Sequence, residues 1–151
     1  MSAHQTRLTD FLPYLLSITS NAVSDRIADQ YRAHFGLKIA EWRVMAVLGD
    51  LGAATQRALV EATRMDKVAV NRACKVLEDR GLLARRPNAA DGRSHHLQLT
   101  GAGNEVYGAI MPIALAMEAR MFSALSAAER GLFKDLLQRI RAQSESTGAQ
   151  S

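Results

Sequence analysis

Residues 55–100 read TQRALVEATRMDKVAVNRACKVLEDRGLLARRPNAADGRSHHLQLT, and this stretch decides how the chain folds. Thr55 and Asp66 are residue types that favour helix N-caps, and Gly81 suits the position after a helix end. The pattern predicts a short helix from Thr55 through Ala62 and a second from Asp66 to Gly81. Only three residues separate them, which is typical of a helix-turn-helix.

A β-hairpin is predicted directly after these two helices. Its strands are Leu82–Pro87 and Ser94–Thr100, and the turn between them is Asn-Ala-Ala-Asp-Gly-Arg. Leu97 and Leu99 alternate with polar neighbours, as residues of a half-buried strand do. A hairpin in this place would form a wing beside the helix-turn-helix.

The positive charge of the chain is concentrated in the same stretch. Residues 55–100 contain nine lysines and arginines against five acids, whereas the rest of the chain has ten of each sign. The net charge of +4 therefore arises entirely within this segment. A local basic field on a patterned segment is the feature expected of a protein that neutralises DNA phosphates.

Further helices are predicted on both sides. Apolar residues recur at helical spacing from Leu12 to Tyr31 and stop before Gly36, and a second helix is expected from about Ala40 to Asp50. In the helix from about Ala40 to Asp50, the side chains expected to face inward are Trp42, Met45 and Leu48, with Val44 as a further candidate. After Thr100 a long helix containing Pro112 is expected to reach about Phe122, and a capping box (residues 126–129) opens a last helix. The outer helices are more apolar than one small core requires, so we expect them to pair with a second copy of the chain.

Composition limits the class of protein. The chain has 151 residues, of which 48% are hydrophobic and only 5% aromatic, which favours one mainly α-helical unit. No window approaches the 18 apolar residues of a membrane span, and the N-terminus lacks the apolar core of a signal peptide. The lone cysteine, Cys74, agrees with a reducing compartment. A cytoplasmic location is therefore expected.

Four ordered blocks resemble the MarR family of winged helix-turn-helix regulators. They are Leu37–Leu48, Met65–Arg72, Leu77–Leu83, and Asp91-Gly92-Arg93 followed by Leu97–Thr100; the similarity spans roughly Phe11 to Ile140. The resemblance implies a mainly α fold with a small β-hairpin wing, in which a DNA-binding region (37–100) lies between dimerisation helices (10–36 and 101–143), all within a single unit of residues 1–151. It also implies a homodimer on a palindromic DNA operator, released by a small-molecule effector.

Candidate DNA contacts follow from residue chemistry within this frame. The helix from Asp66 to Gly81 should pack against its neighbours through Val70, Ala73, Cys74 and Leu77. Its other residues then face outward or lie at the flanks. Asn71 suits a bidentate pair with adenine, Arg72 a guanine or a phosphate, and small apolar side chains the thymine methyl group. An internal ion pair of Arg72 with Glu78 or Asp79 is an equally weighted alternative. The expected contacts are Thr55, Gln56, Lys67, Val68, Ala69, Asn71, Arg72, Lys75, Arg86, Asp91 and Arg93.

An effector pocket is implied by the resemblance alone, at the junction of the dimer helices and the winged head. The residues expected near it are Tyr14, Tyr31, His34, Trp42, Arg43, Met45 and Met111. Each has an individually more ordinary interpretation as a core or surface residue. A cleft with Trp and Met beside a cation would suit an aromatic carboxylate or a conjugate of one.

Other chemistry is weakly supported by the sequence. Cys74 lacks a partner and is expected to be a small core residue rather than a redox switch. His95 and His96 are neighbours on a strand and point to opposite faces, so no metal site is expected. No cofactor is expected, and no nucleophile, base and orienting acid occur at motif spacing, which argues against an enzyme.

Two hypotheses therefore remain. The first is a ligand-responsive, sequence-specific repressor, and the second is an architectural DNA-binding protein without effector control. Only the first requires a pocket and a large ratio of specific to nonspecific affinity.

Overall fold

The computed structural model describes residues 7–87 and 95–149. The chain divides into two compact units, Met1–Ala114 and Leu115–Ser151, and each is described by itself. The expectation that residues 1–151 form a single structural unit stays a prediction.

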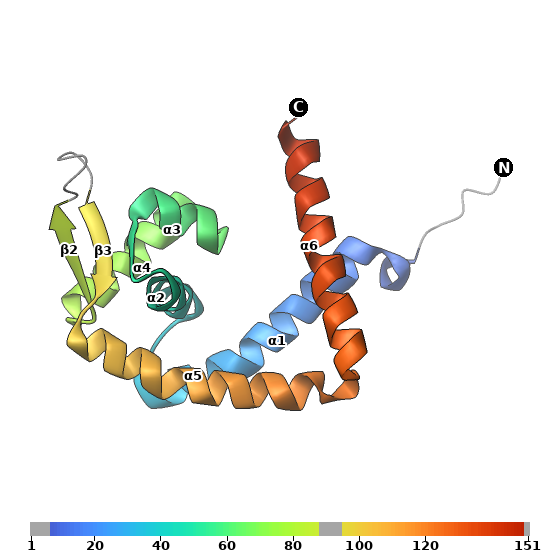
Figure 1. Cartoon of the computed structure of the whole chain (residues 1–151), viewed down its shortest axis with the longest axis horizontal. Helices are drawn as coiled ribbons and strands as arrows, with labels where there is room; N and C mark the ends of the chain where they lie inside the picture. Colours follow the sequence, from blue (N-terminus) through green and yellow to red (C-terminus); the bar gives the residue numbers. More distant parts are fainter. Residues whose placement is uncertain (1–6, 88–94, 150–151) are drawn as a thin grey trace. The chain divides into compact units, whose positions relative to one another are not determined.

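The order of elements confirms the mainly α-helical winged fold (Figure 1). The helices of the first unit are η1 (Leu8–Asp10), α1 (Leu12–Phe35), α2 (Ile39–Leu51), α3 (Gln56–Thr63) and α4 (Lys67–Asp79). Its strands are β1 (Ala53–Thr55), β2 (Leu83–Pro87) and β3 (His95–Leu99). Helix α5 (Gly101–Met121) begins in the first unit and ends in the second, which also contains η2 (Phe122–Ala124) and α6 (Ala127–Ala149).

Both helices of the helix-turn-helix begin at the predicted caps. The Thr55 hydroxyl accepts a hydrogen bond from the Ala58 amide at 3.1 Å, and the Asp66 carboxylate accepts one from Ala69 at 2.8 Å. Each cap satisfies one of the amides that the first turn of a helix leaves without a partner. Gly81 adopts a φ of +73° just after α4, a conformation that glycine adopts without steric cost.

The sheet has one strand more than the hairpin predicted from the sequence. Its order is β1-β3-β2, and both pairs are antiparallel. In β1, Ala54 lies opposite Leu97 of β3, while Leu99 lies opposite Leu83 of β2. A three-residue strand is too short to show a periodic pattern, so sequence reasoning missed β1.

The core of the first unit lies among α2, α3, α4 and the sheet. Its fully buried side chains include Leu37, Val44, Met45, Leu59, Val70, Cys74, Leu77 and Leu97. Trp42, expected inward, is only half-buried. Glu41, on the same face of α2 as Val44 and Met45, is 5% exposed, and the sequence analysis did not anticipate a buried acid there.

The start of α5 is fastened to the junction of α4 and β2. The Thr100 hydroxyl donates to the Gly81 carbonyl at 2.6 Å and accepts from the Gly103 amide at 3.1 Å. A Cβ atom at Gly103 would lie 2.0 Å from the Leu82 carbonyl oxygen. Glycine is therefore required at position 103, because the two backbones approach too closely for any side chain.

The second unit shows the predicted capping box. The Ser126 amide donates to the Glu129 carboxylate at 2.9 Å, and the Glu129 amide donates to the Ser126 hydroxyl at 3.1 Å. These bonds from Ser126 lower the pKa of Glu129. None of the described residues of α6 is buried, and Leu132 and Ile140 are 56% and 51% exposed.

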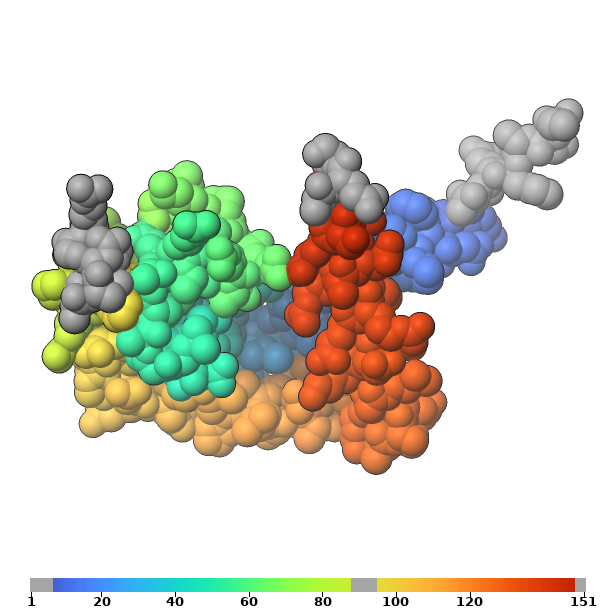
Figure 2. Space-filling model, turned by 45° about the horizontal axis from the view of Figure 1, so that its top comes forward, coloured from blue at the N-terminus to red at the C-terminus, as the bar shows by residue number. Residues whose placement is uncertain are grey.

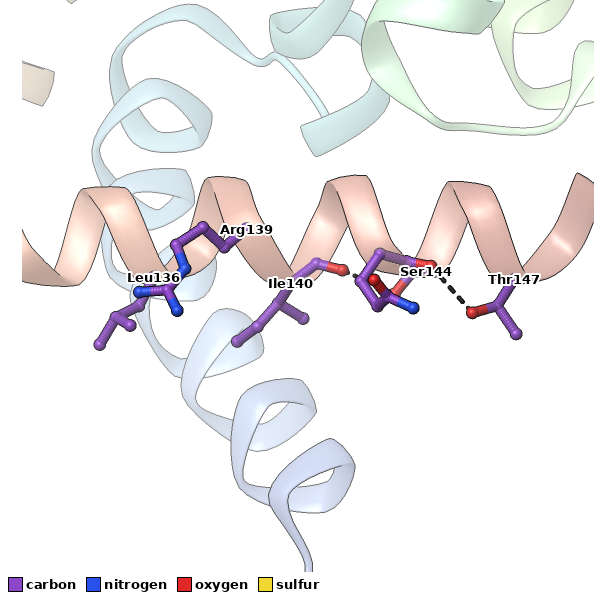
Figure 3. A pocket seen from close by; sticks show the side chains of 6 residues that line it. Leu136, Arg139, Ile140, Ser144 and Thr147 are labelled. Atoms are coloured by element: carbon purple, nitrogen blue, oxygen red, sulfur yellow. Dashed lines mark hydrogen bonds between the residues drawn. The ribbon is translucent and has the colours of Figure 1, made fainter.

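Two surface hollows are lined by residues of the second unit. One of about 670 Å³ is lined by α6 residues, and Figure 3 shows the side chains of Leu136, Ile140 and Thr147 along one side of this helix. Another of about 540 Å³ is lined by residues that include Phe122 and Phe133, whose rings lie 6.0 Å apart.

Within the described residues, no single helix has the length and apolar character needed to cross a membrane; only the bent pair 101–124 and 127–148 passes that test.

Candidate nucleic-acid interface

Helix α4 turns one face inward and the other to solvent, as the sequence predicted. Val70, Ala73, Cys74 and Leu77 are all buried. Among the expected contacts on this helix, Ala69 is half-buried, and the exposed ones are Lys67, Val68, Asn71, Arg72 and Lys75. Val68 is 61% exposed. Part of α3 and α4 is visible in green at the surface of the first unit in Figure 2.

Among residues 7–87 and 95–149, the alternative role for Arg72, an ion pair with Glu78 or Asp79, is not seen. Glu78 instead accepts from Arg85, whose Nε lies 2.5 Å from the Glu78 Oε1 atom. In the part of the chain that the structure describes, Arg72 makes no ion pair. Its guanidinium is therefore available to a ligand.

A chain of polar contacts joins strand β2 of the wing to the exposed face of α4. Arg85 Nη1 also donates to the Gln56 Oε1 atom at 3.3 Å, and Gln56 Nε2 donates to Asn71 Oδ1. Gln56 begins α3, Asn71 lies on α4, and Arg85 lies on β2. Sequence reasoning placed Gln56 and Asn71 separately among the DNA contacts and missed the link between them.

A hollow of about 410 Å³ lies on the same face. Its lining residues are Gln56, Arg57, Val60, Lys67 and Asn71. Lys67 and Arg57 place positive charge at its edge, although Arg57 also lies 3.6 Å from Glu61 one turn along α3. The Thr55 hydroxyl oxygen accepts from the Ala58 amide as the cap of α3, and this bond does not use the hydroxyl hydrogen.

The wing is described only at its base. Arg86 on β2 is exposed and lies against Gln98 on β3; with the Gln98 oxygen facing it, Arg86 donates from Nε at 2.7 Å. Asp91 and Arg93, the expected tip contacts, lie outside the described residues.

Arg80, at the C-terminal end of α4, contacts the end of α1. Its Nη2 donates to the Phe35 carbonyl at 2.7 Å and its Nη1 to the Gly36 carbonyl at 3.4 Å. The last carbonyls of a helix lack partners within that helix, and a cation there is favourable. Arg80 thus links the end of α4 to the end of α1. The sequence pattern offered no signal for this contact, because the partners are backbone atoms 44 and 45 residues away.

The seven residues expected around an effector pocket differ in how deeply they are buried. Tyr31 and Met45 are buried core residues, and Tyr14, Trp42 and Met111 are half-buried; His34 and Arg43 are exposed. The Trp42 ring lies 5.7 Å from that of Tyr31 and stacks at 5.9 Å on that of Tyr107, a residue the sequence analysis did not select. None of the seven lines the three hollows described above.

Two further expectations concern reactive groups. Cys74 is fully buried, and this burial raises the pKa of its thiol to about 11, so the thiolate needed for redox chemistry is scarce at neutral pH. Over residues 7–87 and 95–149, no three His, Cys, Asp or Glu side chains cluster as metal ligands.

Comparison with known proteins places this geometry among transcriptional regulators. A family profile described as MarR family matches residues 35–94. The transcriptional regulator HosA of Escherichia coli O127:H6 is 32% identical over 100 residues, which cover 66% of this chain and 74% of HosA. Among solved structures, the MarR family regulator SPO1453 of Silicibacter pomeroyi DSS-3 is 31% identical with a TM-score of 0.77, over 90% of this chain and 99% of that one. Bordetella bronchiseptica BpsR, whose DNA binding is regulated by 6-hydroxynicotinic acid, is 26% identical with a TM-score of 0.80, over 90% and 96% of the two chains.

Proposed function

Because this chain belongs to the MarR family of DNA-binding transcriptional regulators, we propose that it is a ligand-responsive repressor that binds an inverted-repeat operator as a homodimer. The observation that carries the proposal is the outward face of α4, where cations and the apolar side chain of Val68 are exposed on a helix whose other face is buried in the core. The relatives are regulators rather than enzymes. A regulator of this kind meets its DNA in the cytoplasm.

The division of labour on DNA follows from side-chain chemistry. Asn71 and Arg72 have hydrogen-bonding groups that suit base edges in the major groove, and Val68 suits a thymine methyl group. Lys67 and Lys75 at the flanks, with Arg86 on the wing, suit phosphates. Ala69 and Thr55 keep their proposed places beside the DNA, and Arg93 with Asp91 would form the wing tip.

The proposed dimer rests on the terminal helices. Helix α1 exposes Leu12, Leu16 and Ile18. Helix α6 exposes Leu132 and Ile140. On each of these helices, exposed large apolar side chains recur along the helix and mark an interaction site, and a second copy is its commonest occupant among regulators with two-fold sites. Two recognition helices about 34–36 Å apart would then enter successive major grooves.

Effector control rests on a weaker base, the ring cluster of Tyr31, Trp42 and Tyr107 and the similarity to BpsR. Aromatic rings on the same helices as the exposed cations Arg43 and His34 suit an aromatic acid or its conjugate. Such a ligand lowers DNA affinity only if it favours a conformation that DNA disfavours, and coupling of about 1–3 kcal/mol changes affinity roughly 5- to 150-fold.

Selection of bound fragments from random DNA is the direct test. The repressor hypothesis predicts one enriched inverted repeat whose half-sites lie about one helical turn apart, bound with two chains per site. An architectural protein would enrich no sequence, and that result would reject the proposal. Titration of aromatic acids into the complex then tests control, with Trp42→Ala expected to abolish the response of any active compound.

A further inference from the structure

The hollow of about 540 Å³ in the second unit is lined by residues of three elements. It lies where α5 ends and α6 begins (Figure 1), and η2 between them also contributes. The apolar side chains that line it are Ala119, Phe122, Phe133 and Leu137. Its volume falls in the range of sites that hold small molecules, about 300–1,000 Å³.

Two cations line the hollow together with this apolar surface. Arg130 and Lys134 lie one turn apart on α6. Neither makes an ion pair among residues 7–87 and 95–149. Like charges one turn apart on a helix repel each other, and a bound anion would remove this cost.

The acids nearest to these cations along α6 are engaged elsewhere. The Glu129 carboxylate accepts from the Ser126 amide at 2.9 Å in the helix cap, and Asp135 lies 3.5 Å from Arg139. Glu118 on α5 also lines the hollow, so its lining carries two positive charges against one negative. The hollow therefore has a positive excess beside an apolar wall.

This wall lies on a different face of α6 from Leu132, Leu136 and Ile140. Residues four apart share a face of a helix, and neighbouring residues lie about 100° apart around it. Phe133 and Leu137 therefore form a second stripe. The hollow of about 540 Å³ shares no lining residue with the hollow of about 670 Å³ on the first stripe. Pairing of two chains through the first stripe does not require the second one.

We propose that this hollow binds an organic monocarboxylate with an unsubstituted apolar body, of the kind of a medium-chain fatty acid. The body lies against Phe122, Phe133 and Leu137, and the carboxylate binds the two cations through charge-assisted hydrogen bonds. The described residues that line the hollow include no hydroxyl or amide side chain to pair with further polar groups of a ligand. The inference does not rest on the proposed function, because this binding is measured without DNA.

Calorimetry on the full chain tests the chemistry of the ligand, with decanoate as the probe. Decanoate should bind at one site per chain, and both acetate, which lacks the apolar body, and decanol, which lacks the charge, should bind at least about 10-fold more weakly. Arg130→Gln combined with Lys134→Gln should weaken decanoate binding by about 10-fold or more, the scale of a lost charge-assisted hydrogen bond. Arg141→Gln removes a charge from α6 outside the hollow and is the control that should bind as wild type does. Absence of decanoate binding, or equal affinity in the double variant, overturns the inference.

Thiol labelling tests the location. Ala119→Cys places a thiol in the hollow, and the buried Cys74, whose pKa is raised to about 11, should react slowly with iodoacetamide. Decanoate should slow labelling at position 119 over the same concentrations at which it binds. Glu105→Cys, exposed near the start of α5, is the control and should label at an unchanged rate. Protection at neither position overturns the assignment, and so does a position 119 that reacts only when dilution separates the chains, since a second copy would then cover the hollow.

Discussion

Large apolar side chains are mostly buried in the winged head (residues 37–100) and mostly exposed on the terminal helices α1 and α6. In the head, Leu59, Val70, Leu77 and Leu97 are completely buried. On α6, no described residue is buried, although five large apolar side chains recur there at helical spacing from Leu132 to Ile140. Both regions have amphipathic sequences, but only the head contains the surfaces that cover its own apolar face.

This difference indicates how the two regions are stabilised. The head is closed by contacts within one chain, and the backbones at Gly103 and Leu82 approach too closely for a side chain. Apolar area left in water contributes nothing to stability until something covers it. We therefore expect the terminal helices to depend on association for stability, and the head to be stable without it.

Substitution on α6 should have the largest effect. Leu136→Glu would place a charge in the proposed dimer interface, and loss of two-headed binding should weaken operator affinity by about 100-fold or more. Sedimentation should show monomers, while far-ultraviolet circular dichroism should still show a folded head. Gln138→Glu, on the opposite side of α6, is the control and should remain dimeric. A dimeric Leu136→Glu protein would show that α6 is not the interface.

Glycine substitutions distinguish a position where two backbones are in close contact from positions on exposed helix surface. Gly103→Ala should destabilise the protein by about 1–3 kcal/mol in urea unfolding, because its Cβ meets the Leu82 carbonyl. Gly108→Ala on the same helix and Gly131→Ala on α6 meet nothing within 4 Å. These two should be neutral or stabilise by up to about 1 kcal/mol, since alanine favours helix. Equal effects at all three positions would contradict the contrast between the regions.

Arg80 tests the connection between the head and α1. Arg80→Ala leaves the Phe35 and Gly36 carbonyls to water, and the cost should be about 1 kcal/mol because the site is exposed. Operator affinity should fall by a few fold while the salt dependence of binding stays the same. Arg80→Lys keeps the charge but cannot hold both carbonyls, so its affinity should lie between the two. A change in salt slope would instead mean that Arg80 contacts a phosphate.

The smallest effect should come from the exposed cap of α6. The pKa of Glu129 is lowered in the folded protein, so its contribution is present above the pKa of the unfolded chain and is lost as pH falls through the folded-state value. Thermal unfolding of wild type should therefore lose stability below about pH 4.5 more steeply than Glu129→Gln does. Parallel pH profiles for the two proteins would show that the cap contributes nothing measurable.

Local sequence patterns predicted most of the helix ends in the winged head and the inward face of α4. Thr55, Asp66 and Gly81 mark helix ends through bonds to their own neighbours, and the inward face of α4 follows from its helical spacing. The candidate DNA face followed from the same pattern once the inward residues were assigned. By contrast, β1, the buried Glu41 and the stack of Tyr107 on Trp42 depend on residues distant in sequence, and no periodicity marks them.

The sequence by itself determined where helices begin and end, which faces are apolar, and that the basic excess lies in one segment, because each of these depends on residues a few positions apart. Only the tertiary structure decided that Arg85 takes Glu78 and thereby leaves Arg72 without an ion pair among the described residues. It also decided that Gln56 lies against Asn71 and that Arg80 holds the end of α1. These contacts join residues 7 to 45 positions apart, and hydrogen-bond partners at such separations are selected by the fold and not by local spacing.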